Sequence, residues 1–369
     1  MQELEKKIRY DFFDLLKAIA IFFVIIYHFN NFNSNILGNA SLSAYWNYFF
    51  QAILSTCVPI FFFVNGALLL NKSELDIKKH IRKMIGIVIL ILIWSVITLV
   101  SLSYIRYGSL TFSVFGIARR IFDLRIGWIN HFWFLEALIV IYIFLPLIFT
   151  SFKNNIKHFY FFFVCVLILT FGNKLISDAI VVVNCLFNLF SAKELYSNYF
   201  SDFNAFRGIF GYSIGYFMLG GILFYHKDKI NFKQYRIIAI ITILISMSFL
   251  FLFGIFVSKS QNLMLDIVWD GYDTLFTLAN VIALYIISFN YSHKGRFGRF
   301  IKLTGENSLG IFLIHVIIGN LFNTLYLKFE FSHLFGVNIV YSVLILLVSL
   351  IIVIYMQRSR FLKFFIAIK

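Results

Sequence analysis

The stretch MIGIVILILIWSVITLVSLSYI, residues 84–105, contains no charged side chain. A helix that crosses a membrane needs about 20 mainly apolar residues, because lipid offers the backbone no hydrogen-bond partner outside the helix itself. Residues 84–105 are therefore predicted to form a membrane-spanning helix.

Nine further stretches have the same character, and the whole composition agrees with them. Hydrophobic residues make up 61% of the 369 positions and charged residues 13%, whereas soluble domains average about 25% charged residues. The predicted spans are residues 12–31, 46–70, 84–105, 130–150, 158–172, 206–224, 237–257, 271–290, 306–326 and 337–356. We expect an all-α polytopic membrane protein of about ten transmembrane helices. Residues 1–369 are expected to form a single membrane-embedded domain with no separate soluble domain.

Two segments do not follow this pattern cleanly. Residues 175–190 are apolar only in part, and the sequence leaves open whether they re-enter the membrane or lie at its surface. The loop 106–129 carries four arginines on the side that is otherwise poor in basic residues. They are Arg106, Arg119, Arg120 and Arg125. One hypothesis is that this loop binds an anionic acceptor.

Lysine and arginine gather on alternate connecting segments. The net charge is +15, and the basic residues concentrate in residues 1–11, 71–83, 151–157, 225–236, 291–305 and 357–369. Alternation of this kind is typical of the positive-inside rule. We therefore expect both termini in the cytoplasm. The basic excess is attributed to topology and to contact with membrane lipid, and no nucleic-acid partner is expected.

The first span carries a polar stripe. At about 100° per residue, Asp14, Lys17 and His28 fall on one side of the helix. Asp14 is close enough to pair with Lys17, and Arg9 is a second candidate partner. His28 lies about 16 Å beyond Lys17 along the axis. Ionisable residues inside spans mark functional sites by default, although a buried ion pair and a histidine that ends a helix would be a purely structural alternative.

Other spans add isolated polar side chains. Glu136 lies one turn into an apolar helix, where an ionised carboxylate needs a partner. His131 and Trp133 stand at the entrance of that helix, as cavity residues or as members of an interfacial aromatic belt. Asn65 in the second span either lines a cavity or joins neighbouring helices. His315 lies at mid-depth in the ninth span without an evident structural need.

A basic cluster, Lys79, Arg82 and Lys83, precedes the third span. Lys79 and Arg82 are three residues apart and are expected to share a helix face. Such a cluster suits phosphate groups, Arg especially because of its planar fork, although the positive-inside rule alone explains basic residues here. The sequence has no metal-ligand motif, no phosphate-binding glycine loop and no serine nucleophile elbow. No metal is expected.

Taken in order, these segments resemble acyltransferase family 3, the bacterial membrane O-acyltransferases that modify cell-surface polysaccharides. The resembling motifs are Phe13-Asp-Leu-Leu-Lys17 with Tyr27-His28, Val58-Pro-Ile-Phe-Phe-Phe-Val-Asn-Gly66, His131-Phe-Trp-Phe-Leu135 and Ser308-Leu-Gly-Ile-Phe-Leu-Ile-His315. The chain looks closest to the single-domain type that is similar to the enterobacterial-common-antigen O-acetyltransferases. Two positions depart from the family pattern, since Lys17 and Lys79 stand where arginine is usual.

The resemblance implies a multi-pass protein of the bacterial plasma (inner) membrane. Its reaction would move acetyl from cytoplasmic acetyl-CoA to a hydroxyl of a surface glycan or of its lipid-linked precursor. On that reaction His28 is the expected general base, since a neutral imidazole suits this role near pH 7, and Glu136 is expected to orient it. The acyl-CoA is expected to bind Lys79, Arg82, Lys83, Lys17, Asp14 and Arg9. Cavity walls are expected from His131, Trp133, Asn65 and His315.

Other classes of function remain open at this stage. A transporter or flippase of a glycan or lipid-linked precursor would also have buried polar residues among ten helices. The same fold with succinyl-CoA as donor is a second alternative, and a membrane scaffold without chemistry is a third. The sequence specifies neither the glycan nor its hydroxyl, and it leaves open whether the reaction has a covalent intermediate. The oligomeric state is also open.

Overall fold

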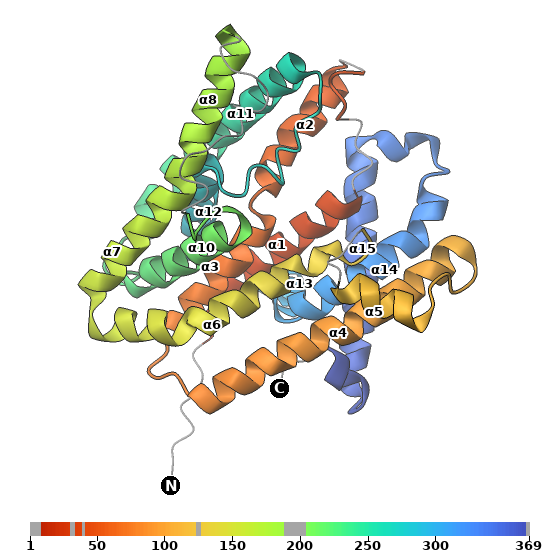
Figure 1. The fold of residues 1–369 in the computed structure, drawn as a ribbon, viewed down its shortest axis with the longest axis horizontal. Helices are drawn as coiled ribbons and strands as arrows, with labels where there is room; N and C mark the ends of the chain where they lie inside the picture. The colour runs from red at the N-terminus through yellow and green to blue at the C-terminus, as the bar shows by residue number, and fades with distance from the viewer. Residues whose placement is uncertain (1–8, 30–33, 39–40, 123–126, 188–203, 367–369) are drawn as a thin grey trace.

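The structure is a computed structural model that describes residues 9–29, 34–38, 41–122, 127–187 and 204–366. These residues form helices and connecting turns, with no β-strand among them (Figure 1). The helices are α1 Asp11–Phe29, α2 Leu42–Leu54, α3 Cys57–Leu70, α4 Ile77–Tyr107, α5 Val114–Phe122, α6 Trp133–Asn154, α7 Ile156–Leu167, α8 Asn173–Phe187, α10 Gly208–Tyr225, α11 Arg236–Gln261, α12 Leu275–Ser288, α13 Gly295–Glu306, α14 Ser308–Tyr326 and α15 Phe335–Arg358. Shorter turns are η1 Asn130–Phe132, the π-helical η2 Ile168–Gly172, η3 Phe232–Tyr235, η4 Glu330–His333 and η5 Leu362–Phe365.

In the described part of the chain, 9 helical segments are long and apolar enough to cross a membrane. The all-α polytopic fold is thus confirmed, and nine of the predicted spans correspond to these segments. The remaining one, residues 271–290, contains α12, which has only 14 residues. It starts late because Thr274 caps it: the Thr274 side chain accepts a hydrogen bond from the Thr277 backbone N–H, and the residues before it form turns.

The predicted second span is broken into α2 and α3. Pro59 lies in the first turn of α3, where it lacks the N–H that would continue the hydrogen-bond ladder from α2. At the break, the Ser55 and Thr56 hydroxyls donate to the carbonyls of Ala52 and Ile53. These bonds satisfy backbone groups that would otherwise be costly inside a membrane. Together α2 and α3 still cover residues 42–70.

The predicted fifth span and the ambiguous segment 175–190 belong to one long helical run. Helices α7 and α8 are joined without a turn through the π-helical η2. At η2, the Thr170 hydroxyl donates to the Phe206 carbonyl, and the Asn204 side-chain amide donates to the Leu169 carbonyl. Residues 175–187 therefore continue a helical run that is long and apolar enough to cross a membrane, and they do not form a separate segment; residues 188–190 lie outside the described residues.

Helix α4 extends at both ends into segments that were predicted as loops. It begins after Asp76, whose side chain accepts from the Lys79 backbone N–H. It ends at Gly108, which has the left-handed φ of 71° that favours glycine. The basic cluster thus lies in the first two turns of α4, and the loop 106–129 contains the short helix α5. Arg125 lies outside the described residues.

Close packing holds α3 against α10. Gly66 of α3 lies against the Phe217 backbone, and Gly220 of α10 lies against the Phe63 backbone, so that neither glycine has room for a Cβ. Small residues at such crossings let helices approach closely in membranes. Helix α1 runs through the centre, where it contacts α3, α13, α14 and α15. In Figure 1, α8, α11 and α2 follow one another along the top from the left, and α14 lies on the right, where it contacts α4 and α15.

Contacts between the helix termini define two ends of the bundle. The start of α1 meets the end of α10, where the Tyr10 and Phe224 rings lie 4.9 Å apart. The end of α3 is at the same level, because the Asn71 side-chain amide donates to the Gly221 carbonyl at 3.0 Å. We call this end the basic end; it carries Arg9, Lys72, Lys79, Lys83 and Lys227. The opposite end, with the last turn of α1 and the turns before α12, is the far end.

Candidate active site

A cavity of about 610 Å³ opens at the far end. Its walls come from α1, α2, α3, α6 and the turns between α11 and α12. The lining residues that carry polar groups are Tyr27, His28, Ser34, Asn35, Tyr48, Gln51, Cys57, Asn130, His131, Trp133, Asp266, Trp269 and Tyr272. We call this the far-end cavity. Segments distant in the sequence meet here, as expected for a ligand site in a helical bundle.

His28 lies in the last turn of α1, and its side chain is exposed to the far-end cavity. The placement follows from the length of α1: seventeen residues after Asp11 correspond to about 26 Å, close to the full hydrocarbon thickness. The imidazole has no hydrogen-bond partner among the described residues. Both ring nitrogens are therefore available to a molecule in the cavity.

Two further histidines surround His28. The His315 ring centroid lies 5.3 Å from that of His28, and the His131 centroid lies 6.2 Å from it. His131 and His315 are 5.8 Å apart and both are buried. His315 Nδ1 lies 2.7 Å from the Phe312 carbonyl oxygen, which only accepts, so Nδ1 carries the proton. The sequence predicted these three residues separately, and the fold brings them together.

The histidine cluster contains imidazole nitrogens that no described group of the protein uses. Among the residues that the structure describes, no group of three or more His, Cys, Asp or Glu side chains is placed to hold a metal ion. Within the described parts of the chain, His131 Nε2 and His315 Nε2 are buried and make no hydrogen bond. Buried polar atoms of this kind are rare and call for an explanation. His131 lines the far-end cavity, as expected, whereas His315 does not line it and instead contacts the His28 ring.

The carboxylate of the far-end cavity is Asp266. Its Oδ2 accepts from the Tyr27 hydroxyl at 2.6 Å, next to His28 on α1. Its Oδ1 accepts from the backbone N–H groups of Val268 and Trp269 at 3.0 and 3.1 Å. Sequence reasoning missed Asp266 because it lies in a turn and not inside a span. The available signal was an acidic residue beside Trp269 in a turn on the side poor in basic residues.

Trp133 also lines the far-end cavity, as predicted from the sequence. Its ring lies 5.4 Å from Trp269 and 5.9 Å from Tyr272, and the latter two rings lie 5.8 Å apart. Trp133 is therefore part of an aromatic wall and not of an interfacial belt.

Glu136 does not lie on the far-end cavity, contrary to the expectation that it orients His28. It follows His131 by five residues, about 140° around α6. It faces a second cavity of about 180 Å³ between α4, α5 and α6, with Ser95 and Ile121 among the lining residues. The geometry therefore gives no support to a direct role for Glu136 at His28.

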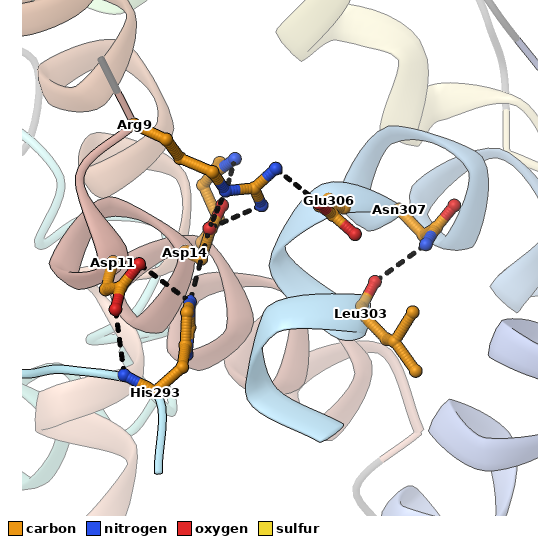
Figure 2. Close-up of polar contacts among 8 residues, drawn as sticks. Arg9, Asp11, Asp14, His293, Leu303, Glu306 and Asn307 are labelled. Atoms are coloured by element: carbon orange, nitrogen blue, oxygen red, sulfur yellow. Dashed lines mark hydrogen bonds and ion pairs between the residues drawn. The ribbon is translucent and has the colours of Figure 1, made fainter. Parts of the chain in front are cut away.

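Arg9, Asp14 and Lys17 meet at the basic end, where they form a closed ion-pair network (Figure 2). Asp14, with a side chain only 4% exposed, accepts from Arg9 Nε and pairs with Lys17 Nζ, both at 2.9 Å. Arg9 also pairs with Glu306 at the end of α13. Burial opposes the charge on Arg9, but the hydrogen bonds and charges of Asp14 and Glu306 outweigh it and raise its pKa. The predicted pairing of Asp14 with both cations is confirmed.

The fold adds His293 to this network. Its backbone N–H donates to Asp11 at 2.9 Å, and its Nε2 lies 3.4 Å from Asp14 Oδ2. Helix α13 can approach this closely because Gly305 lies against the Asp14 backbone. The sequence offered no signal for a contact between the start of α1 and the segment before α13, because the two are almost 280 residues apart.

The predicted phosphate cluster is divided between two cavities. Lys79 and Lys83 line one of about 230 Å³, together with Lys72, His80 and Tyr142; we call it the basic cavity. Arg82 lines a different cavity, beside Phe364 of η5. Lys79 and Arg82 therefore do not point to the same site, contrary to expectation. Lys83 lies on the face of α4 toward α6, and Arg82 is about 100° further around the helix.

Asn65 lies between the two ends and not on the far-end cavity. Its Nδ2 donates to the Phe61 carbonyl at 2.9 Å, and its Oδ1 accepts from the Tyr142 hydroxyl at 3.4 Å. The same hydroxyl accepts from Lys83 Nζ at 3.0 Å. Asn65 is thus connected through Tyr142 to the basic cavity, whereas the sequence suggested it as a wall of the substrate cavity.

Comparison with known proteins settles the class. A family model described as an acyltransferase domain, Acyl_transf_3, matches residues 10–358. The chain belongs to this acyltransferase family. No curated protein and no solved structure matches the chain. The family resemblance of the motifs is thereby confirmed, and the protein is a multi-pass membrane acyltransferase.

Proposed function

We propose that this acyltransferase moves an acetyl group from acetyl-CoA, bound at the basic end, to a hydroxyl of a glycan or lipid-linked precursor in the far-end cavity. The basic end would face the cytoplasm of a bacterium, in its plasma membrane. The observation that carries the proposal is that His28 is exposed to a large cavity at the far end, while Lys79 and Lys83 line a separate cavity at the basic end.

His28 would act as general base on the acceptor. Its free imidazole takes the proton of the acceptor hydroxyl as the oxygen attacks the thioester carbonyl carbon. The carbon–sulfur bond then breaks, and the proton passes from His28 to the leaving thiolate, so that free CoA and an acetyl ester result. Buried His315 and His131 hold the ring of His28 through contacts on two sides.

The basic cavity would hold the phosphates of the donor. Lys79 is 82% exposed in its side chain and pairs with Asp76 at 3.1 Å, a contact that a phosphate would replace. Lys83 is held by the Tyr142 hydroxyl at the inner side of the cavity. A cationic cavity raises the local concentration of an anionic ligand such as CoA. The charges of Arg9, Asp14 and Lys17 already pair with one another. These residues would therefore shape the entrance to the donor site and not bind its phosphates.

Phenylalanine side chains separate the two cavities. Phe134 contacts Phe61 and Phe62, with ring centroids 5.5 and 5.1 Å apart. From Phe134 on the far-end cavity to Tyr142 on the basic cavity is about 12 Å along α6. The pantetheine arm would have to cross this distance, and it would have to displace these rings to bring the thioester to His28.

Acetyl-CoA turnover by purified protein in lipid nanodiscs tests the proposal. We expect acetyl-CoA to bind and to be hydrolysed slowly without acceptor, His28→Ala to lose turnover but not binding, and Lys83→Gln to bind about tenfold more weakly. Absence of binding by wild-type protein that unfolds cooperatively on heating would contradict the acetyl donor. Binding of succinyl-CoA in its place would identify the alternative donor.

A further inference from the structure

One wall of the far-end cavity is formed by aromatic side chains. Trp269 is 41% exposed, and its ring meets Trp133 edge-to-face at 83°. The Tyr272 ring contacts both tryptophan rings. The carbon–hydrogen face of a sugar ring packs on such aromatic surfaces, and a few polar groups beside them fix its orientation.

Polar groups suited to sugar hydroxyls stand around this aromatic wall. The Asn35 side-chain oxygen accepts from the Leu37 and Gly38 backbone N–H groups, so its amide N–H donors remain for a ligand. Gln51 donates to Ser34 and leaves its carbonyl oxygen as an acceptor. Asp266 is exposed to the cavity and supplies a carboxylate.

The charge of the cavity limits what it can bind. Of the described residues that line it, none is lysine or arginine, whereas Asp266 carries a carboxylate. Asp270 lies close by: burial raises its pKa, Lys174 acts against that rise, and Asp266 and Asp178 add to it. The lining of the far-end cavity therefore carries a negative charge, and an anionic ligand should bind there several-fold or more weakly than a neutral one.

We propose that the far-end cavity binds one sugar ring without a negative charge, stacked on Trp269 and Trp133, with a hydroxyl or amino group on Asp266. A sugar with an ammonium group gains most from the Asp266 carboxylate. A uronate or a phosphate-bearing sugar is excluded. This inference rests on the proposed function in taking the bound ring as the acceptor.

Arg106 and Arg120 of the loop 106–129 do not offset this charge within the cavity. Arg106 lies over the Trp128 ring and donates to Asn320, and Arg120 lies over the Phe112 ring. Neither lines the far-end cavity. An acceptor that entered the cavity would thus meet Asp266 and not these cations, which argues against the anionic acceptor suggested by the sequence.

Sugar binding without acetyl-CoA tests the inference. Saturation-transfer NMR on nanodisc protein would compare methyl glycosides of glucosamine, glucose and glucuronic acid. We expect saturable binding of the first two, strongest for the glucosamine derivative, and binding of the glucuronide weaker by at least about tenfold. Asp266→Asn should abolish this ranking and Asp266→Glu should restore it, whereas Trp269→Ala should weaken all three. Trp46→Ala, an exposed tryptophan of α2 outside the cavity, should change nothing.

Equal or stronger binding of the glucuronide would overturn the inference, and so would an unchanged ranking in Asp266→Asn. Absence of binding by all three glycosides, in protein that still hydrolyses acetyl-CoA, would also overturn it while leaving the acyltransferase proposal intact. Conversely, sugar binding by protein without acetyl-CoA turnover would contradict the proposed function and support the sugar site.

Discussion

The two ends of this acyltransferase treat polar side chains in opposite ways. At the basic end, Asp14 is almost completely buried, and its oxygens are paired with Arg9 and Lys17. At the far end, His28 faces a cavity of about 610 Å³ without a partner among the described residues, beside two buried histidines with unused nitrogens. The Asp14 carboxylate is thus satisfied within the protein, whereas the imidazole of His28 is open to a molecule that enters the cavity.

The Asp14 network contributes to the stability of the fold, whereas His28 is placed for chemistry. A buried carboxylate that loses its partners is strongly destabilising, so the Asp14 network fixes α1 against α13. The His28 imidazole contributes little to folding, because it faces a cavity that is polar enough to hold water or a substrate. Substitution of Asp14 should therefore lower the unfolding temperature, whereas substitution of His28 should lower the activity.

The largest effect is expected at His28. His28→Ala removes the general base and should lower acetyl transfer by about 10²–10⁴-fold, with unchanged membrane insertion and unfolding temperature. Transfer of radiolabelled acetyl from acetyl-CoA measures it. His333→Ala, an exposed histidine of η4, is the matched control. Activity of His28→Ala within about threefold of wild type would remove His28 from the mechanism.

Asp14→Ala should act on stability. It leaves Lys17 and Arg9 without their shared carboxylate and is expected to cost on the order of 3 kcal/mol. A lower unfolding temperature in nanodiscs and a lower yield of folded protein would report this loss. Asp228→Asn, an exposed carboxylate near the same end, should be neutral. A normal unfolding temperature in Asp14→Ala would mean that the network does not hold α1 to α13.

A smaller effect is expected on acetyl-CoA binding at the basic end. Lys83→Gln removes a cation from the basic cavity and should weaken acetyl-CoA binding about tenfold, the scale of one charge-assisted hydrogen bond. Arg82→Gln should weaken it less, because Arg82 lines a different cavity. Titration calorimetry with Lys78→Gln as control measures both. The reverse order would move the phosphate site to Arg82 and η5.

The smallest effect is a pH dependence at the far end. Burial raises the pKa of Asp273 from its ordinary 3.8 to about 6; Lys174 acts against this, and Asp178 and Asp270 reinforce it. The folded state therefore binds the proton more tightly than the unfolded state. The contribution of Asp273 to stability should be greatest below about pH 4 and should be lost as the pH rises through 6.

Asp273→Asn removes that dependence. It should raise the unfolding temperature at pH 7, by an amount equivalent to roughly 1–2 kcal/mol, and should have little effect near pH 4. Unfolding temperatures at both pH values, with Asp228→Asn as control, measure it. An equal shift at the two pH values would show that the protonation of Asp273 is not the cause.

Patterns within one helix were predictable from the sequence. The spacing of Asp14, Lys17 and His28 follows from the helical repeat, and the apolar stretches gave the spans. Side chains that meet across the fold were not. Asp266 reaches Tyr27 over 239 residues, and no local pattern indicates such a contact. The directions of Glu136 and Arg82 depended on which helices pack beside α6 and α4, which the sequence does not specify.

The central claim is that donor and acceptor are used from opposite ends of the bundle. Proteoliposomes with labelled acetyl-CoA trapped inside and methyl glucoside supplied only outside test it directly. We expect acetylated glucoside to accumulate outside, and none with His28→Ala. Product that forms only when acetyl-CoA and the sugar are on the same side of the membrane would contradict the account.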